Sequence, residues 1–192
     1  LARADLVSLK VDTVCENVWK RIDRPHKSLR FSEILDGVRA FSEAYDGKLI
    51  TDTMLIDGLN DDENDLEQLA GFLGEIGPEK AYLAVPTRPP AVDLAAPAPE
   101  FKLNLAYQIV SKRVRCAELL TGYEGNEFSS TGDAVVDLLN ITSVHPMRED
   151  AVKILLDRSG EDWGVVDRLV RDGRLQEAAY AGHQFYLRTR KA

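Results

Sequence analysis

Side chains that commonly bind metals are few in this sequence and are not spaced as ligand sets. Cys15 and Cys116 lie far apart, and neither has a second cysteine at the C-x2-C spacing of metal-binding loops. The three histidines, His26, His145 and His183, form no helical or zinc-like pair. The sequence also has no G-x-S-x-G turn, Walker loop or dinucleotide fingerprint. We therefore expect no metal site formed by this chain alone.

Polar segments rich in glycine, proline or carboxylates follow four apolar runs, at Asp12–Thr13, Asp57–Asn60, Pro86–Pro89 and Gly122–Glu127. Prolines flank Arg88, which either binds a ligand carboxylate or phosphate or pairs with a local acidic residue. In the second segment Gly58 provides a permissive backbone, and either Asn60 or Asp61 caps the next helix. A loop in that place can equally contact a ligand, and the sequence leaves both alternatives open.

The elements that position these segments alternate between strand and helix. Apolar runs predict strands at 5–11, 48–56, 81–85 and 116–120, with helices at 15–22, 28–47, 66–76 and 100–113 between and after them. Such units give parallel strands joined by right-handed crossovers, and their active sites lie at the carboxyl ends of the strands. We predict an α/β fold in which 1–132 form a partial (β/α) TIM-like barrel. Its rim should bring together Asp12, Asn60, Arg88 and Glu124.

The remaining residues, 133–192, predict a small winged-helix-like α+β unit. Helices are expected at 133–140, 150–158 and 162–171, followed by a hairpin of 175–180 and 184–187. The last helix mixes charges, with Asp162, Asp167 and Asp172 beside Arg168 and Arg171. Duplex DNA is therefore not an expected partner, because its phosphates need a basic face. A structural lid or a contact with a protein suits this unit better.

Composition places the chain among ordinary globular proteins, with 44% hydrophobic and 29% charged residues and a net charge of −8. No apolar run is long enough to span a membrane and no secretory leader is visible, so we expect a cytoplasmic protein. The chain starts at Leu1 and enters an apolar strand within a few residues. We therefore expect a fragment whose upstream part is missing, with 8–11 left as an exposed strand edge that favours self-association.

Several of these segments resemble radical S-adenosylmethionine (SAM) enzymes. Ser8–Asp12 followed by Val18–Pro25 resembles their fourth strand and the next helix, and is similar to the wyosine-forming, tRNA-modifying branch. Met54–Asp61 resembles the turn after the fifth strand, which glycyl-radical activating enzymes share, and Ala81–Pro90 is similar to the sixth strand and its loop. The whole order, completed by Tyr123–Glu127 and His145–Arg148, most resembles a little-characterised group of iron–sulfur oxidoreductases.

The resemblance implies a site made of cofactor-binding residues Ser8, Lys10, Asp12, Asp52, Asn60, Val85, Thr87 and Arg88 and substrate-binding residues Tyr123, Glu124 and Asn126. It implies SAM and a [4Fe–4S] cluster as cofactors of a full-length parent. The C-x3-C-x2-C loop of that family is absent here, Asp57 stands where many relatives have proline, and Lys10 stands where the wyosine branch has aspartate. We therefore expect no cofactor on this chain alone, and we assign no catalytic residue.

Two functions of different classes follow. In the first, the chain is the C-terminal part of a radical SAM oxidoreductase, inactive by itself, whose partner is the missing half of the barrel. In the second, the chain is a noncatalytic module that binds a protein or tRNA through its winged-helix-like end. The sequence upstream of Leu1 would discriminate between them, because the cysteine loop should lie there.

Overall fold

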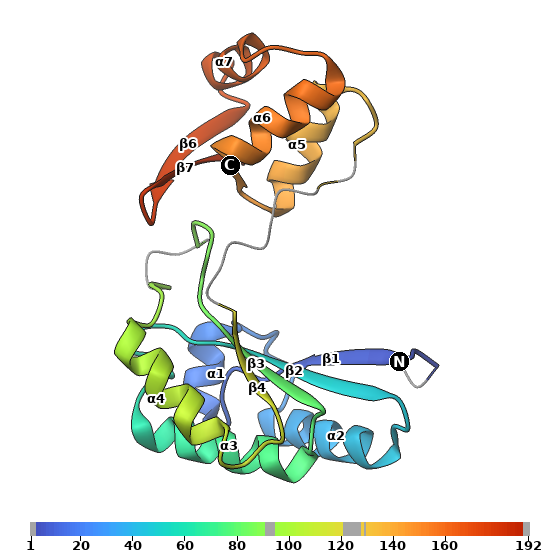
Figure 1. Cartoon of the computed structure of the whole chain (residues 1–192), viewed down its shortest axis with the longest axis vertical. Coiled ribbons are helices and arrows are strands. Elements are labelled where there is room, and N and C mark those ends of the chain that lie inside the picture. Colours follow the sequence, from blue (N-terminus) through green and yellow to red (C-terminus); the bar gives the residue numbers. More distant parts are fainter. Residues whose placement is uncertain (1–2, 91–94, 121–127, 129, 190–192) are drawn as a thin grey trace. The chain divides into compact units, whose positions relative to one another are not determined.

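The computed structural model describes residues 3–90, 95–120, 128 and 130–189, which fold into two compact units (Figure 1). The first unit comprises Leu1–Pro86 and Val92–Thr121, and the second comprises Thr87–Ala91 and Gly122–Ala192. The predicted substrate residues Tyr123, Glu124 and Asn126 lie outside the described residues. Among the described residues, no helix is long and apolar enough to cross a membrane.

The first unit is a parallel sheet with helices between its strands. Its elements are β1 (Leu6–Lys10), α1 (Glu16–Ile22), α2 (Phe31–Ala44), β2 (Lys48–Met54), α3 (Glu63–Ile76), β3 (Lys80–Ala84), α4 (Glu100–Val110) and β4 (Ala117–Leu120). The strands pair in sequence order, β1-β2-β3-β4, and every pair is parallel. Helices α2, α3 and α4 all lie on one side of the sheet (Figure 1). In a (β/α) barrel the parallel strands also follow one another in sequence order, with all helices on the outer side of the sheet. The predicted partial (β/α) barrel is therefore confirmed.

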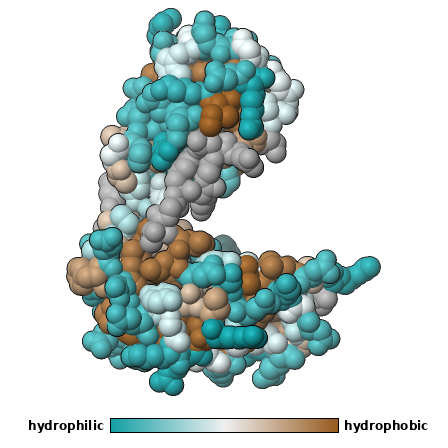
Figure 2. Space-filling model, viewed as in Figure 1, coloured by the Kyte–Doolittle hydropathy of each residue, from teal (hydrophilic) through white to brown (hydrophobic). Residues whose placement is uncertain are grey.

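Alternating burial along the strands shows that the two sheet faces differ. Residues such as Thr51, Thr53 and Leu83 are fully buried, whereas their neighbours along the strands are half-buried. The buried face packs on α3 and α4, whose apolar side chains form one core, including Leu66, Leu69, Leu73, Ala106 and Val110. The opposite face corresponds to the interior of a closed barrel. In Figure 2, apolar patches interrupt the hydrophilic surface on the side of this unit away from α2 and α3.

Two predicted helix starts are wrong in detail. Helix α2 begins at Phe31 rather than at Ser28, whose hydroxyl instead lies 2.8 Å from Nδ1 of His26. Helix α3 is capped by Asp62, which accepts hydrogen bonds from the backbone N–H groups of Asn64 and Asp65, and not by Asn60 or Asp61. The reason is that Asn60 and Asp61 are turned inward to hold the preceding turn. Gly58 in that turn has a φ of +64°, as its permissive backbone predicts.

The second unit has the element order of a winged helix. It contains α5 (Ala134–Val144), β5 (Met147–Arg148), α6 (Glu149–Ser159), α7 (Gly164–Arg171), β6 (Leu175–Tyr180) and β7 (His183–Arg188). The strands form an antiparallel sheet in the order β5-β7-β6, which confirms the predicted hairpin. Helix α5 runs through the break predicted at 143–146 as far as Val144, and the short strand β5 was not predicted.

Asp137 of α5 fixes the segment of the second unit that leads into this helix. Its Oδ2 accepts hydrogen bonds of 2.8 Å from the Ser130 hydroxyl and the Thr131 N–H, and its Oδ1 accepts one from the Thr131 hydroxyl. Asp137 itself is only 3% exposed. Burial alone would raise the pKa of Asp137, but the hydrogen bonds from Thr131 and Ser130 outweigh it and lower the pKa below its ordinary value.

We expect Asp137→Asn to destabilise the second unit by about 2 kcal/mol, because an amide cannot accept at both positions. Because the folded pKa of Asp137 is lowered, its contribution is present above the unfolded pKa of about 3.9 and is lost as the pH falls through the folded pKa. The measurement is urea unfolding followed by Trp163 fluorescence in a Trp19→Phe background at several pH values. Asp157→Asn, at an exposed position of α6, is the control, and an equal loss in both variants would contradict this role.

Candidate functional site

A row of polar side chains crosses the open face of the sheet near the carboxyl ends of its strands. The strand register places Lys10 beside Asp52, Asp52 beside Tyr82, and Tyr82 beside Glu118. Lys80 precedes Tyr82 by two residues on β3 and so lies on the same face. It forms an ion pair of 2.6 Å with Glu118 and lies over the Tyr82 ring. Four neighbouring strands thus each contribute a charged or hydrogen-bonding group to the face that would line a barrel.

Lys10 joins this row to the edge of the sheet. Its ammonium contacts Oδ2 of Asp12 and lies 2.5 Å from Oδ1 of Asp23, which follows α1. Asp12 is 3% exposed, and its Oδ1 accepts a 2.9 Å hydrogen bond from the Met54 N–H. A cation between two carboxylates, with one carboxylate fixed by backbone, is a preorganised group that can bind the charged or hydroxyl groups of a ligand.

The environment shifts the pKa values of both partners upward. Burial raises the pKa of the Asp12 carboxyl, although Lys10 and the Met54 N–H act in the opposite direction. Burial alone would lower the pKa of Lys10, but its attraction to Asp12 and Asp23 outweighs this and raises the pKa. Lys10 therefore stays protonated through the neutral range and acts as a fixed positive charge.

Asn60 holds this edge together through its side-chain amide. Nδ2 donates to the carbonyl oxygens of Asp12 at 2.8 Å and Met54 at 2.9 Å, and Oδ1 accepts from the Ile56 N–H at 2.8 Å. The residue is 2% exposed. The amide thereby ties the end of β1 to the end of β2 and to the turn that follows. The sequence left open whether this loop has a structural role or contacts a ligand. The hydrogen bonds of Asn60 favour the structural role.

The structure places only some of the predicted site residues together. Ser8, Lys10 and Asp52 share the open face, and Asp12 and Asn60 meet at its carboxyl edge. Val85 packs against the core of the first unit. Thr87 and Arg88 belong to the second unit, where the Arg88 guanidinium lies 5.9 Å from the Phe128 ring centre. That Arg88 and Glu124 join Asp12 and Asn60 at one rim stays a prediction.

Sequence reasoning missed four members of the site: Asp23, Lys80, Tyr82 and Glu118. Tyr82 and Glu118 sit at alternate positions of strands that were correctly predicted. The period of two places each of them on the face opposite the apolar core residues Leu83 and Ala81, which was a usable signal. Asp23 carried no such signal, because its ion pair depends on how α1 turns back toward β1.

The two cysteines lie at opposite edges of the sheet. Cys15 follows the carboxyl end of β1 as the residue before α1, whereas Cys116 precedes the amino end of β4. In the described part of the chain, no group of three His, Cys, Asp or Glu residues is placed to hold a metal ion. These residues therefore do not fit a [4Fe–4S] cluster, which needs several converging thiolates.

Comparison with solved structures defines the class of fold. A radical SAM methyltransferase from Sphaerobacter thermophilus superposes with a TM-score of 0.52 at 18% identity, over 65% of this chain and 36% of that one. The first unit has the architecture of a radical SAM-like partial barrel. The match at this identity concerns the fold alone.

Several of the sequence relatives are UPF0026 proteins. The chain is 39% identical to a UPF0026 protein of Methanocaldococcus jannaschii over 193 residues, which cover 98% of this chain and 59% of that protein. A UPF0026 protein of Helicobacter pylori is 34% identical over 89 residues, covering 46% of this chain and 29% of that protein. No family model matches the sequence. The chain thus spans about 59% of the length of the archaeal relative.

Proposed function

We propose that this chain is the C-terminal part of a radical SAM oxidoreductase and forms the wall of the barrel that contacts SAM and the substrate. The observation that carries the proposal is the polar row on the open sheet face, which ends at the Lys10–Asp12–Asp23 cluster on the carboxyl edge. Barrel enzymes place their ligands at this edge. The radical SAM-like fold and the motifs along β1, β2 and β3 support the same assignment.

The chemistry of the row suits one part of such a site. SAM carries a ribose diol, an ammonium and a carboxylate, and these groups pair with acidic, hydroxyl and basic side chains. Ser8, Lys10 and Asp52 offer all three types on one face. In such an enzyme a [4Fe–4S] cluster would provide the reducing electron, and its thiolate ligands would come from another part of the polypeptide or from a partner. Within this chain, the residues orient the cofactor and the substrate.

The role of Lys10 can be tested in a polypeptide that extends upstream through a C-x3-C-x2-C loop. We expect Lys10→Met to lower 5′-deoxyadenosine formation about tenfold or more, because a charge-assisted contact is worth about 1.5–3 kcal/mol. The iron–sulfur absorbance per polypeptide should stay unchanged. An unchanged absorbance would show that the variant is folded and has lost only a contact with SAM. Lys112→Met, beyond α4 at the amino edge of the sheet, is the control. Equal turnover in both variants would argue against a SAM-facing Lys10.

A further inference from the structure

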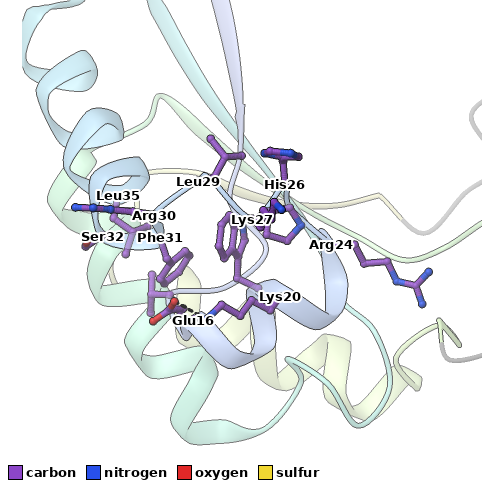
Figure 3. Close-up of a pocket in the computed structure, with 13 residues that line it drawn as sticks. Glu16, Lys20, Arg24, His26, Lys27, Leu29, Arg30, Phe31, Ser32 and Leu35 are labelled. Carbon is purple, nitrogen blue, oxygen red and sulfur yellow. Dashed lines mark ion pairs between the residues drawn. The ribbon is translucent and has the colours of Figure 1, made fainter.

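The first unit contains a pocket of about 840 Å³ between α1 and the start of α2 (Figure 3). A cavity of this size accommodates a ligand as large as a nucleotide. Trp19 and Phe31 line it, with ring centres 5.0 Å apart, and Leu29 and Leu35 extend the apolar wall. The lining includes Val14 and residues of α1, which directly follow the carboxyl end of β1.

Many of the other residues that line this pocket are basic, although Glu16 is also on the lining. Lysine or arginine occupies five of the eleven positions from Lys20 to Arg30, with Asp23 as the one acidic residue, whereas the whole chain has a net charge of −8. The basic side chains on the lining are Lys20, Arg24, His26, Lys27 and Arg30. A local concentration of positive charge on an acidic protein draws anions to that place.

Only part of this charge is neutralised by neighbouring carboxylates. Lys20 pairs with Glu16 at 2.7 Å, and Arg30 lies 3.3 Å from Glu33. Within the described part of the chain, Arg24 and Lys27 form no ion pair. These two residues therefore keep their charge available to a ligand.

The backbone at Arg24 is unusual for an arginine. Its φ is +46°, a left-handed conformation that costs energy at any residue with a Cβ atom. Such strain persists where the surroundings fix it, and it is frequent at binding sites. The Arg24 side chain extends away from Phe31 and Glu16 (Figure 3), and it also lines a second, smaller pocket of about 180 Å³ together with Lys20. The residue thus lies between two cavities.

We propose that this pocket binds a phosphate ester of nucleotide size. The phosphate oxygens contact Arg24 and Lys27, and the planar part of the ligand packs against the apolar wall that includes Leu29 and Phe31. Guanidinium and ammonium groups are the usual partners of phosphate, and a mixed basic and apolar lining matches a molecule with both kinds of surface. The ligand is either a free nucleotide or a nucleotide within a single strand of RNA. The site depends neither on an iron–sulfur cluster nor on SAM.

The test measures fluorescence anisotropy of labelled adenosine triphosphate and of a labelled single-stranded oligouridylate at about 150 mM salt. The double variant Arg24→Asn/Lys27→Ala removes both charges, and asparagine tolerates the left-handed backbone, so the fold is not put at risk. Lys112→Ala/Arg115→Ala removes the same charge at the amino edge of the sheet and serves as the control. We expect the first variant to weaken binding about tenfold or more and the control to change it less than twofold.

Saturable binding of either probe with this pattern supports the proposal, and the probe that binds tells a free nucleotide from an RNA strand. Absence of saturable binding of both probes would overturn it. Equal weakening in both double variants would also overturn it, because binding would then follow overall charge rather than this pocket.

Discussion

Replacing Asn60 with alanine is expected to destabilise the first unit by about 3–5 kcal/mol. The substitution removes three hydrogen bonds and leaves the carbonyls of Asp12 and Met54 and the N–H of Ile56 without a partner in a site that is 2% exposed. An unmade buried hydrogen bond costs about 1–3 kcal/mol for each group, and domains are stable by only about 5–15 kcal/mol. The measurement is urea unfolding monitored by Trp19 fluorescence in a Trp163→Phe background.

An isosteric variant separates the hydrogen bonds from the loss of volume. In Asn60→Asp a carboxylate oxygen would face the two carbonyl oxygens that Nδ2 now donates to, so we expect a loss at least as large as that of Asn60→Ala. Asn64→Ala, at an exposed position on α3, is the matched control and should change stability by less than about 0.5 kcal/mol. A small effect of both Asn60 variants would show that the edge of the sheet is held by other contacts.

The functional importance of this clamp follows from where it acts. Asn60 bonds to the carbonyl of Asp12, and Asp12 in turn fixes Lys10. If the amide is lost, the end of β1 is no longer tied to the end of β2, and the charged cluster loses its defined position. Catalytic and binding groups need support of this kind to stay within a fraction of an ångström of their working geometry.

The fold could be predicted from local patterns because its strands are short apolar runs separated by helical periodicity. Parallel pairing followed from the crossovers, and the shared carboxyl edge followed from parallel pairing. The predicted cap of α2 failed because the Ser28 hydroxyl instead pairs with His26, and that of α3 failed because several candidates stood side by side. In the segment Asn60-Asp61-Asp62, any of the three side chains can cap a helix, and only tertiary contacts turn the first two inward.

The candidate site was only partly predictable. Asp12 and Asn60 were predicted to lie together because both follow the carboxyl ends of parallel strands. The structure joins them by a hydrogen bond from the Asn60 amide to the Asp12 carbonyl. The partners of Lys10 depend on the register of β1 against β2 and on the return of α1, which local sequence does not specify. The basic pocket was missed for a different reason. Its charges are evident in the sequence from Lys20 to Arg30, but they line a pocket only because α1 and the start of α2 pack together, which the local sequence does not specify.

The second large effect concerns catalysis. Cys15 and Cys116 lie at opposite edges of the sheet, so the two thiols of this chain cannot converge on one cluster. We expect Cys15→Ser and Cys116→Ser to leave the cluster content of the longer polypeptide unchanged. Serine at the cysteines of the proposed upstream loop should abolish the cluster, because a [4Fe–4S] centre needs such thiolates.

The most direct test of the proposed function is anaerobic reconstitution with iron and sulfide, followed by reaction with SAM and a reductant. We expect no stable cluster absorbance and no 5′-deoxyadenosine from this chain, and both from a polypeptide that extends upstream through the proposed cysteine loop. Reductive cleavage of SAM by this chain alone, or a longer polypeptide that holds a cluster but never cleaves SAM, would contradict it.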